Sequence, residues 1–154
     1  MAHIKRYGHH DARQHPCRVL MVEDSPDDLI LARKNLEISE DVHEVICFSR
    51  GQALIDYIKR HDASARPALA TIPTVIVVDL MMADMDGFEV LRQLKAEAPL
   101  RGVPVIVVSG AASFENIRRA LALKAAAFFQ KPLSACDLHA VLRHGWPWPP
   151  QRAL

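Results

Sequence analysis

Apolar residues follow two alternating patterns along the chain. Five short runs are almost continuously apolar, as in buried strands, and cover residues 17–22, 42–48, 74–78, 103–108 and 126–130. After each run, apolar residues recur at helical spacing: Leu29-Ala32-Leu36, Leu54-Tyr57-Ile58, Phe88-Leu91-Leu94, Phe114-Ile117-Leu121 and Leu138-Val141-Leu142. Because the strands are continuously apolar and do not alternate with polar residues, we expect a parallel sheet covered by helices on both faces. The pattern therefore predicts an α/β protein.

Local signals mark the ends of these elements and of the domain. Ser25 is a suitable N-cap, and Pro26 suits the first position of the helix that follows residues 17–22. Residues 1–16 are polar and have no apolar period, so we expect a flexible arm there. Residues 145–154, GWPWPPQRAL, contain prolines that exclude a regular helix. The predicted organisation is an arm (1–16), one α/β domain (17–144) and a tail (145–154) that contains Trp146 and Trp148.

Composition narrows the function classes. A length of 154 residues favours a single domain, and a formal net charge of +1 gives no reason to expect nucleic acid or an anionic membrane as a partner. No apolar run approaches the length of a transmembrane helix, and the start has no signal-peptide pattern. The three cysteines lack a CxxC spacing and are expected to be reduced. We therefore expect a soluble, cytoplasmic protein.

Four of the five predicted strands end in residues able to take part in chemistry: Glu23-Asp24, Asp79, Ser109 and Lys131. Parallel strands bring their carboxyl ends to one edge of the sheet, where doubly wound proteins bind ligands. Clustered carboxylates repel one another unless a cation lies between them, and oxygen ligands suit Mg²⁺. A lysine and a hydroxyl can hold a phosphoryl group, which an Asp can accept as an acyl phosphate. The strand ends thus predict Mg²⁺-dependent phosphoryl transfer onto Asp79.

Four sequence blocks carry a family resemblance: VEDSPDD at 22–28, VVDLMMADMDGFEVL at 77–91, VVSGAA at 107–112 and FFQKPL at 128–133. In this order and spacing they resemble the receiver domain of two-component response regulators, over residues 17–144. The resemblance implies a flavodoxin-like, doubly wound (βα)5 fold with a parallel five-stranded sheet of order 2-1-3-4-5. Since only a short tail follows the domain, the chain resembles the stand-alone type of regulator. The aromatic, proline-bearing tail further resembles regulators paired with bacterial phytochrome kinases.

The resemblance also implies roles for individual residues. Asp79 is the expected phosphoacceptor, and Glu23, Asp24, Asp79 and the main-chain carbonyl of Met81 are the expected Mg²⁺ ligands. Residues expected to bind the phosphoryl group or to switch with it are Ser109, Lys131 and Phe128.

Simpler interpretations stay open beside these roles. Asp24 could cap the first helix only, and Ser109 could be a turn residue only. Phe128 could be an ordinary core side chain, and it stands where the family commonly has Tyr. Asp84 and Asp86 are expected to be turn and cap residues. Ala83 replaces the usual proline of the loop after the phosphoacceptor, which should leave that loop less rigid.

The predicted function is that of a response regulator that accepts a phosphoryl group from a sensor histidine kinase or a phosphotransfer protein. It would signal through protein contacts and would not be a turnover enzyme. A homodimer is also expected, through the fourth helix (around 114–121), the fifth strand (126–130), the fifth helix (around 138–142) and the tail. The alternatives are a degenerate receiver that acts only as a binding platform, and a metal-dependent phosphatase. Met81 argues against the phosphatase, because that chemistry needs a second acid two residues after the nucleophile.

Overall fold

Strands and helices alternate along the chain, as the apolar pattern predicts. The computed structural model describes residues 16–62, 72–97, 100 and 103–143, so the tail and all of the arm except residue 16 lie outside the described residues. The strands are β1 (Cys17–Val22), β2 (Val42–Phe48), β3 (Thr74–Asp79), β4 (Val105–Ser109) and β5 (Ala127–Gln130). The helices are α1 (Pro26–Glu37), α2 (Gly51–Asp62), α3 (Gly87–Ala96), α4 (Phe114–Ala122) and α5 (Ala135–Arg143).

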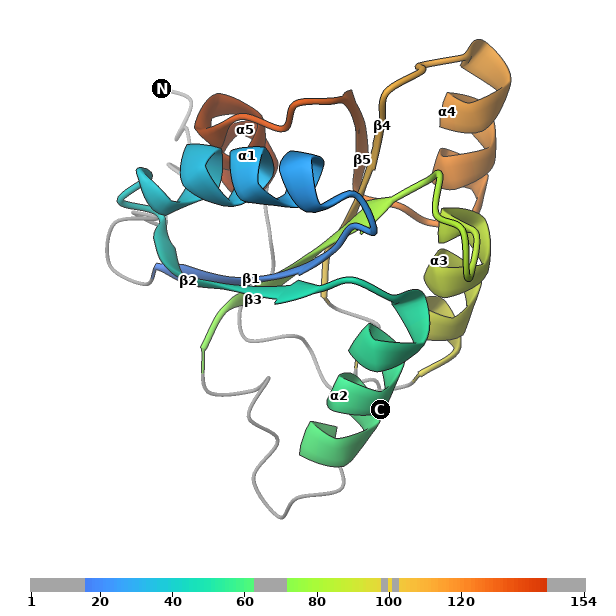
Figure 1. Ribbon diagram of the computed structural model, residues 1–154, viewed down its shortest axis with the longest axis horizontal. Coiled ribbons are helices and arrows are strands. Elements are labelled where there is room, and N and C mark those ends of the chain that lie inside the picture. Colours follow the sequence, from blue (N-terminus) through green and yellow to red (C-terminus); the bar gives the residue numbers. More distant parts are fainter. Residues whose placement is uncertain (1–15, 63–71, 98–99, 101–102, 144–154) are drawn as a thin grey trace, which may run out of the picture.

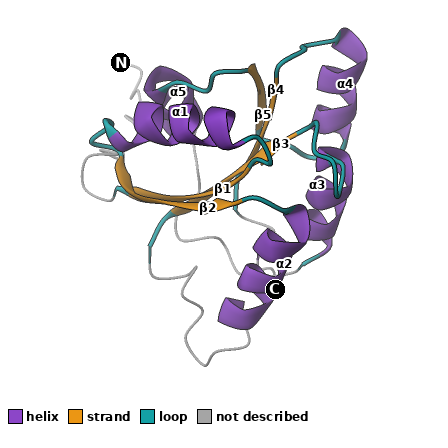
Figure 2. Ribbon diagram, in the orientation of Figure 1, coloured by secondary structure: helices purple, strands orange, loops and turns teal. Residues whose placement is uncertain are grey.

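The five strands form one parallel sheet in the order β2-β1-β3-β4-β5. Helices α1 and α5 lie on one face of the sheet, and α2, α3 and α4 lie on the other (Figures 1 and 2). The predicted α/β class and the strand order 2-1-3-4-5 are therefore confirmed. None of the helices in the described residues is long and apolar enough to cross a membrane.

Two cores hold these layers together, one on each face of the sheet. One core joins the strands to α2, α3 and α4 through residues such as Leu54, Leu91 and Ala120. The other joins them to α1 and α5 through Leu36 and Leu138. Every residue of β3 and β4 is buried, which explains why both strands are apolar up to their last residues, apart from Thr74 at the start of β3. The polar residues that end them are therefore held in a rigid, dry setting.

The predicted start of the fourth strand is wrong by two residues. Residues 103–108 were expected to form it, but β4 covers Val105–Ser109. Pro104 has no N–H to donate to a neighbouring strand, so regular pairing begins after it. Its carbonyl still accepts a 3.0 Å hydrogen bond from the Ile76 amide. The strand also ends one residue later than predicted, because Ser109 still pairs with Gln130 of β5.

Capping residues fix where the helices near the sheet edge begin. Ser25 caps α1 by accepting a hydrogen bond from the Asp28 amide, as its place in the sequence predicts. Asp86 caps α3 by accepting hydrogen bonds from the amides of Phe88, at 2.6 Å, and Glu89, at 3.2 Å. Both helices start close to the carboxyl ends of strands, so both caps help to shape the loops around Asp79.

Candidate functional site

Three carboxylates meet at the carboxyl ends of β1 and β3. Val22 of β1 is in register with Val78 of β3, so the residues that follow, Glu23 and Asp79, lie side by side. One oxygen of each of Glu23, Asp24 and Asp79 lies within 4.8 Å of the others. Asp79 is 1% exposed and Glu23 is 4% exposed, whereas Asp24 is only partly buried. We call these three residues the carboxylate trio.

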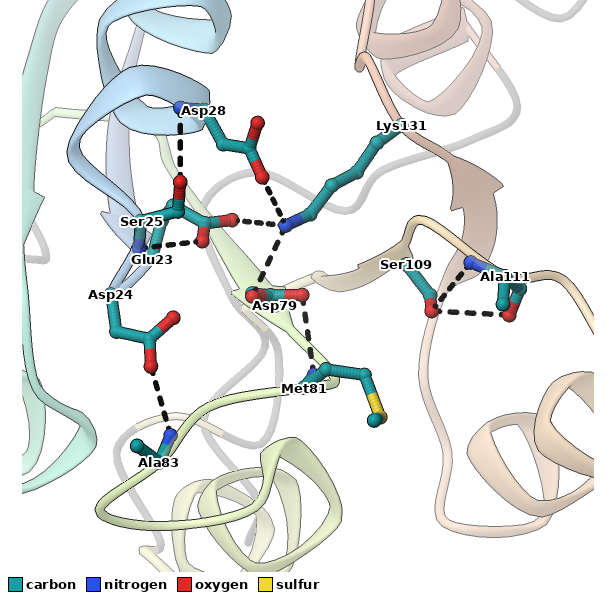
Figure 3. Close-up of polar contacts among 10 residues, drawn as sticks. All are labelled: Glu23, Asp24, Ser25, Asp28, Asp79, Met81, Ala83, Ser109, Ala111 and Lys131. Atoms are coloured by element: carbon teal, nitrogen blue, oxygen red, sulfur yellow. Dashed lines mark hydrogen bonds and ion pairs between the residues drawn. The ribbon is translucent and has the colours of Figure 1, made fainter.

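The Asp79 carboxylate has one satisfied oxygen and one unsatisfied oxygen. Its Oδ1 accepts a 3.2 Å hydrogen bond from the Met81 amide (Figure 3). Its Oδ2 lies 3.2 Å from Lys131 Nζ, within ion-pair distance. Even so, Oδ2 is buried and accepts no hydrogen bond of good geometry from the described residues. A buried oxygen left in this way costs about 1–3 kcal/mol, so it favours a ligand that supplies the missing contact.

Lys131 brings its ammonium group to the centre of the site. Its Nζ lies 2.6 Å from Glu23 Oε2 and 3.1 Å from Asp28 Oδ2, besides the contact with Asp79 (Figure 3). Burial lowers the pKa of this lysine, but the hydrogen bonds to Glu23 and Asp28 and the charge of Asp79 outweigh burial and raise the pKa overall. For Glu23 the balance differs: burial, together with the neighbouring Asp79 carboxylate, raises its pKa overall, although the hydrogen bonds from Lys131 and the Ser25 amide lower it.

Asp28 is the member of this group that the sequence did not single out. It belongs to the block VEDSPDD, shortly after Pro26, but no role of its own was predicted for it. The signal was present, because the cap at Ser25 places Asp28 in the first turn of α1, directly beyond the end of β1. A side chain there lies at the same edge of the sheet as Lys131.

Asp24 contacts the loop that follows β3. Its Oδ2 accepts a 2.8 Å hydrogen bond from the amide of Ala83, which belongs to this loop and not to the start of a helix. The carboxylate thus orders the loop that also carries Met81, whose amide bonds to Asp79. The Met81 side chain points outward and the residue is 71% exposed. Its main-chain carbonyl therefore stays a predicted ligand by its position beside Asp79.

Ser109 and Phe128 do not contact the carboxylates. The Ser109 hydroxyl donates to the Ala111 carbonyl at 3.1 Å and accepts from the Ala111 amide at 3.2 Å. Figure 3 shows this hydroxyl directed to its own loop and apart from Asp79. Phe128 is partly buried and packs against the core on the side of α2, α3 and α4. The structure therefore brings together Glu23, Asp24, Asp79 and Lys131, but not the two residues expected to switch.

The donor set fits a hard divalent cation such as Mg²⁺. The carboxylate trio offers only oxygen ligands, and a small cation near these atoms would offset the repulsion between them. The unsatisfied Asp79 Oδ2 supplies an oxygen that needs a partner. Lys131 alone cannot balance the charge, since its single ammonium group contacts three carboxylates, those of Glu23, Asp28 and Asp79, and Asp24 adds a fourth beside Glu23 and Asp79.

Comparison with known proteins identifies the family. The family model for the response regulator receiver domain matches residues 19–143. The chain belongs to this family. This receiver domain is similar to the probable methanogenesis regulatory protein FilR2 of Methanothrix harundinacea, with 31% identity over 123 residues, which are 80% of this chain and 77% of that protein.

Two solved structures of response regulators resemble this receiver domain. The phosphorylated cyanobacterial phytochrome response regulator RcpA has 26% identity and a TM-score of 0.64, over 83% of this chain and 89% of that chain. The Mn²⁺-bound form of response regulator Rcp1 has 27% identity and a TM-score of 0.62, over 83% of this chain and 90% of that chain. The resemblance seen in the four sequence blocks is thus confirmed for the receiver family.

Proposed function

We propose that this receiver domain accepts a phosphoryl group on Asp79 in a Mg²⁺-dependent reaction and signals through protein contacts. The observation that carries the proposal is the state of Asp79: a buried carboxylate at a strand end, with one unsatisfied oxygen 3.2 Å from a lysine ammonium. A carboxylate with a structural role only would be expected to have both oxygens hydrogen-bonded. The similar structures of RcpA, which is phosphorylated, and of Rcp1, which is Mn²⁺-bound, support the same proposal.

The chemistry is a displacement at phosphorus. A carboxylate oxygen of Asp79 attacks the phosphorus of a phosphohistidine, and the O–P bond forms as the N–P bond of the donor breaks. The donor imidazole leaves with a proton from solvent, and Asp79 becomes an acyl phosphate. Bound Mg²⁺ would neutralise charge on the transferring phosphoryl oxygens. Lys131 would stabilise the same charge, because its ammonium group already lies within ion-pair distance of Asp79.

Five further residues have proposed roles in this reaction. The carboxylates of Glu23 and Asp24 and the main-chain carbonyl of Met81 would hold Mg²⁺ together with Asp79. Ser109 would bind a phosphoryl oxygen, which requires its hydroxyl to leave the Ala111 amide and carbonyl. Phe128 would move inward when Ser109 turns, and its partial burial leaves it neither fully packed nor free in solvent.

Partners follow from this proposal. A sensor histidine kinase or a phosphotransfer protein would donate the phosphoryl group in the cytoplasm, and the domain would act as a signalling module without multiple turnover. A homodimer through α4, β5, α5 and the tail is supported by Phe114 and Leu121 of α4, which are 81% and 49% exposed. A mass in solution that stays monomeric with and without beryllofluoride would contradict the dimer.

The proposal is tested by phosphorylation in vitro. The wild type is incubated with Mg²⁺ and acetyl phosphate, and the adduct is measured by intact mass and on a phosphate-affinity gel. Asp79→Asn should abolish the adduct, whereas Asp84→Asn, which removes an acid from the following loop, should retain it. A wild type without an Asp79 adduct would refute the proposal and favour a binding platform. Rapid multiple turnover on small phosphate esters would favour a phosphatase instead.

A further inference from the structure

Lys131 has three carboxylate partners among the described residues, and they are not equivalent. Two of them, Glu23 at 2.6 Å and Asp79 at 3.2 Å, belong to the carboxylate trio. The third, Asp28 at 3.1 Å, comes from the first turn of α1 and is outside the trio. The ammonium group therefore shares two partners with any cation that the trio binds, and has one partner of its own.

A divalent cation and the Lys131 ammonium group compete for the same oxygens. Both are positive, so each weakens the attraction of Glu23 and Asp79 for the other. Without another partner, Lys131 would either hold these two carboxylates against the cation or lose its contacts when the cation binds. A carboxylate outside the trio avoids both outcomes, because Lys131 can keep a charge-assisted hydrogen bond to it while its contacts with Glu23 and Asp79 are given up to the cation.

The local structure allows Asp28 to serve in this way. Its place in α1 is fixed by Pro26 in the first turn and by the hydrogen bond from its own amide to Ser25 Oγ. The residues that line a pocket of about 290 Å³ include Asp28, Lys131 and Glu23, so the lysine side chain has room beside Asp28. The Asp28 side chain is 49% exposed, whereas that of Glu23 is 5% exposed, and a partner in solvent is easier to retain than one buried with other acids.

We infer that Asp28 is a positioning residue that retains Lys131 beside Asp79 when a divalent cation occupies the carboxylate trio. The inference rests on the proposed function, because it assumes that the trio binds Mg²⁺ and that Lys131 serves the phosphoryl group. It adds a residue of α1 to the site and makes that residue a determinant of cation affinity that need not touch the cation.

Mg²⁺ titration of the unphosphorylated protein tests this inference. The amides of Met81 and Ala83, which bond to Asp79 and Asp24, report binding by NMR chemical shift. Asp28→Asn should weaken Mg²⁺ binding about threefold relative to Asp27→Asn, as expected for a partly exposed ion pair. Asp27 is the matched control, since it is exposed, carries the same charge and makes no ion pair within the described residues.

The role of Lys131 is isolated by repeating both substitutions in a Lys131→Met background. There Asp28→Asn and Asp27→Asn should change Mg²⁺ affinity equally, since the side chain that Asp28 holds is gone. In the wild-type background, Asp28→Glu should restore part of the affinity lost in Asp28→Asn. A difference between the two Asn variants that persists without Lys131 would overturn the inference in favour of simple charge attraction.

The proposed function and this inference fail in different ways. A wild type that binds no Mg²⁺ would overturn both the metal site and the role of Asp28. A wild type that binds Mg²⁺ and forms the Asp79 adduct with acetyl phosphate, but with equal affinities for Asp28→Asn and Asp27→Asn, would overturn only the inference. Circular dichroism of each variant checks that the fold is retained.

Discussion

At Gly87, a single added methyl group should displace the backbone next to Asp79. It begins α3 directly against the end of β3, and a Cβ there would lie 2.4 Å from the Asp79 carbonyl oxygen and 2.7 Å from Leu80 Cα. Both are backbone atoms, so neither can rotate away as a side chain would. The Gly87 amide also donates a 3.0 Å hydrogen bond to the Leu80 carbonyl. Gly87→Ala must therefore push α3 away from the strand that carries Asp79.

The expected loss of stability is the sum of two destabilising contributions and one stabilising contribution. Overpacking at a buried contact costs about 1–3 kcal/mol. Weakening the hydrogen bond between Gly87 and Leu80 adds about 0.5–1.5 kcal/mol. Replacing glycine also reduces the freedom of the unfolded chain, which returns about 0.4–1 kcal/mol. The net destabilisation should be about 1–3 kcal/mol, and each kcal/mol lowers the melting temperature of a domain of this size by about 2–4 °C.

Urea unfolding measures this effect against a matched control. An added Cβ at Gly110 would meet nothing within 4 Å, so Gly110→Ala should leave the unfolding free energy unchanged or slightly raised. At Gly51 the nearest atom would be Val90 Cγ2 at 2.7 Å, the end of a side chain, so Gly51→Ala should lie between the two. Equal unfolding free energies for the variants of Gly87 and Gly110 would refute the argument that the backbone of β3 leaves no room.

Three further predictions concern a cap, the thiols and pH. Asp86→Ala should destabilise the fold by about 1 kcal/mol, because two amides of α3 lose their hydrogen-bond acceptor. Urea unfolding measures this change, and an unchanged urea midpoint would contradict it. Burial raises the pKa of the Cys17 thiol to about 12, so iodoacetamide at pH 8 should label the exposed Cys136 first. Peptide mass spectrometry measures the labelling of each cysteine, and faster labelling of Cys17 would contradict its burial. Burial raises the pKa of Glu23 above 4.5, so the folded, metal-free protein holds this proton more tightly than the unfolded chain. Its unfolding free energy should therefore rise relative to Glu23→Gln as the pH falls through the raised pKa toward 4.5, and a constant difference across a series of urea titrations would count against this.

Local patterns in the sequence were enough to predict the elements but not their arrangement. Each predicted strand lies within two residues of an observed one, because a continuous apolar run records burial on both faces of a sheet. The largest difference lies at Pro104, whose missing amide delays the start of β4. Which strands are neighbours is decided by contacts distant in sequence, and periodicity carries no information about them. The order 2-1-3-4-5 was therefore predicted from the family resemblance alone.

In the candidate site, the positions set by the backbone could be predicted from sequence, whereas the contacts that side chains choose could not. A residue at the end of a parallel strand is placed by the backbone, which is why Asp79 and Glu23 could be brought together from sequence. The partner that a side chain chooses depends on all donors and acceptors within its reach. Ser109 finds both a donor and an acceptor two residues away at Ala111 and turns to them.

Lys131 shows the same principle over a longer distance. Its flexible side chain reaches Asp28, which lies 103 residues earlier in the sequence, and no local pattern could have paired them. The result is a centre in which one ammonium group is shared by acids from β3, from the end of β1 and from α1. Because negative charge remains in excess there, the site should bind cations more tightly, and the fold should be less stable when no cation is bound. On the proposed function, the buried acids that destabilise the metal-free fold would then be the same groups that bind Mg²⁺ beside Asp79.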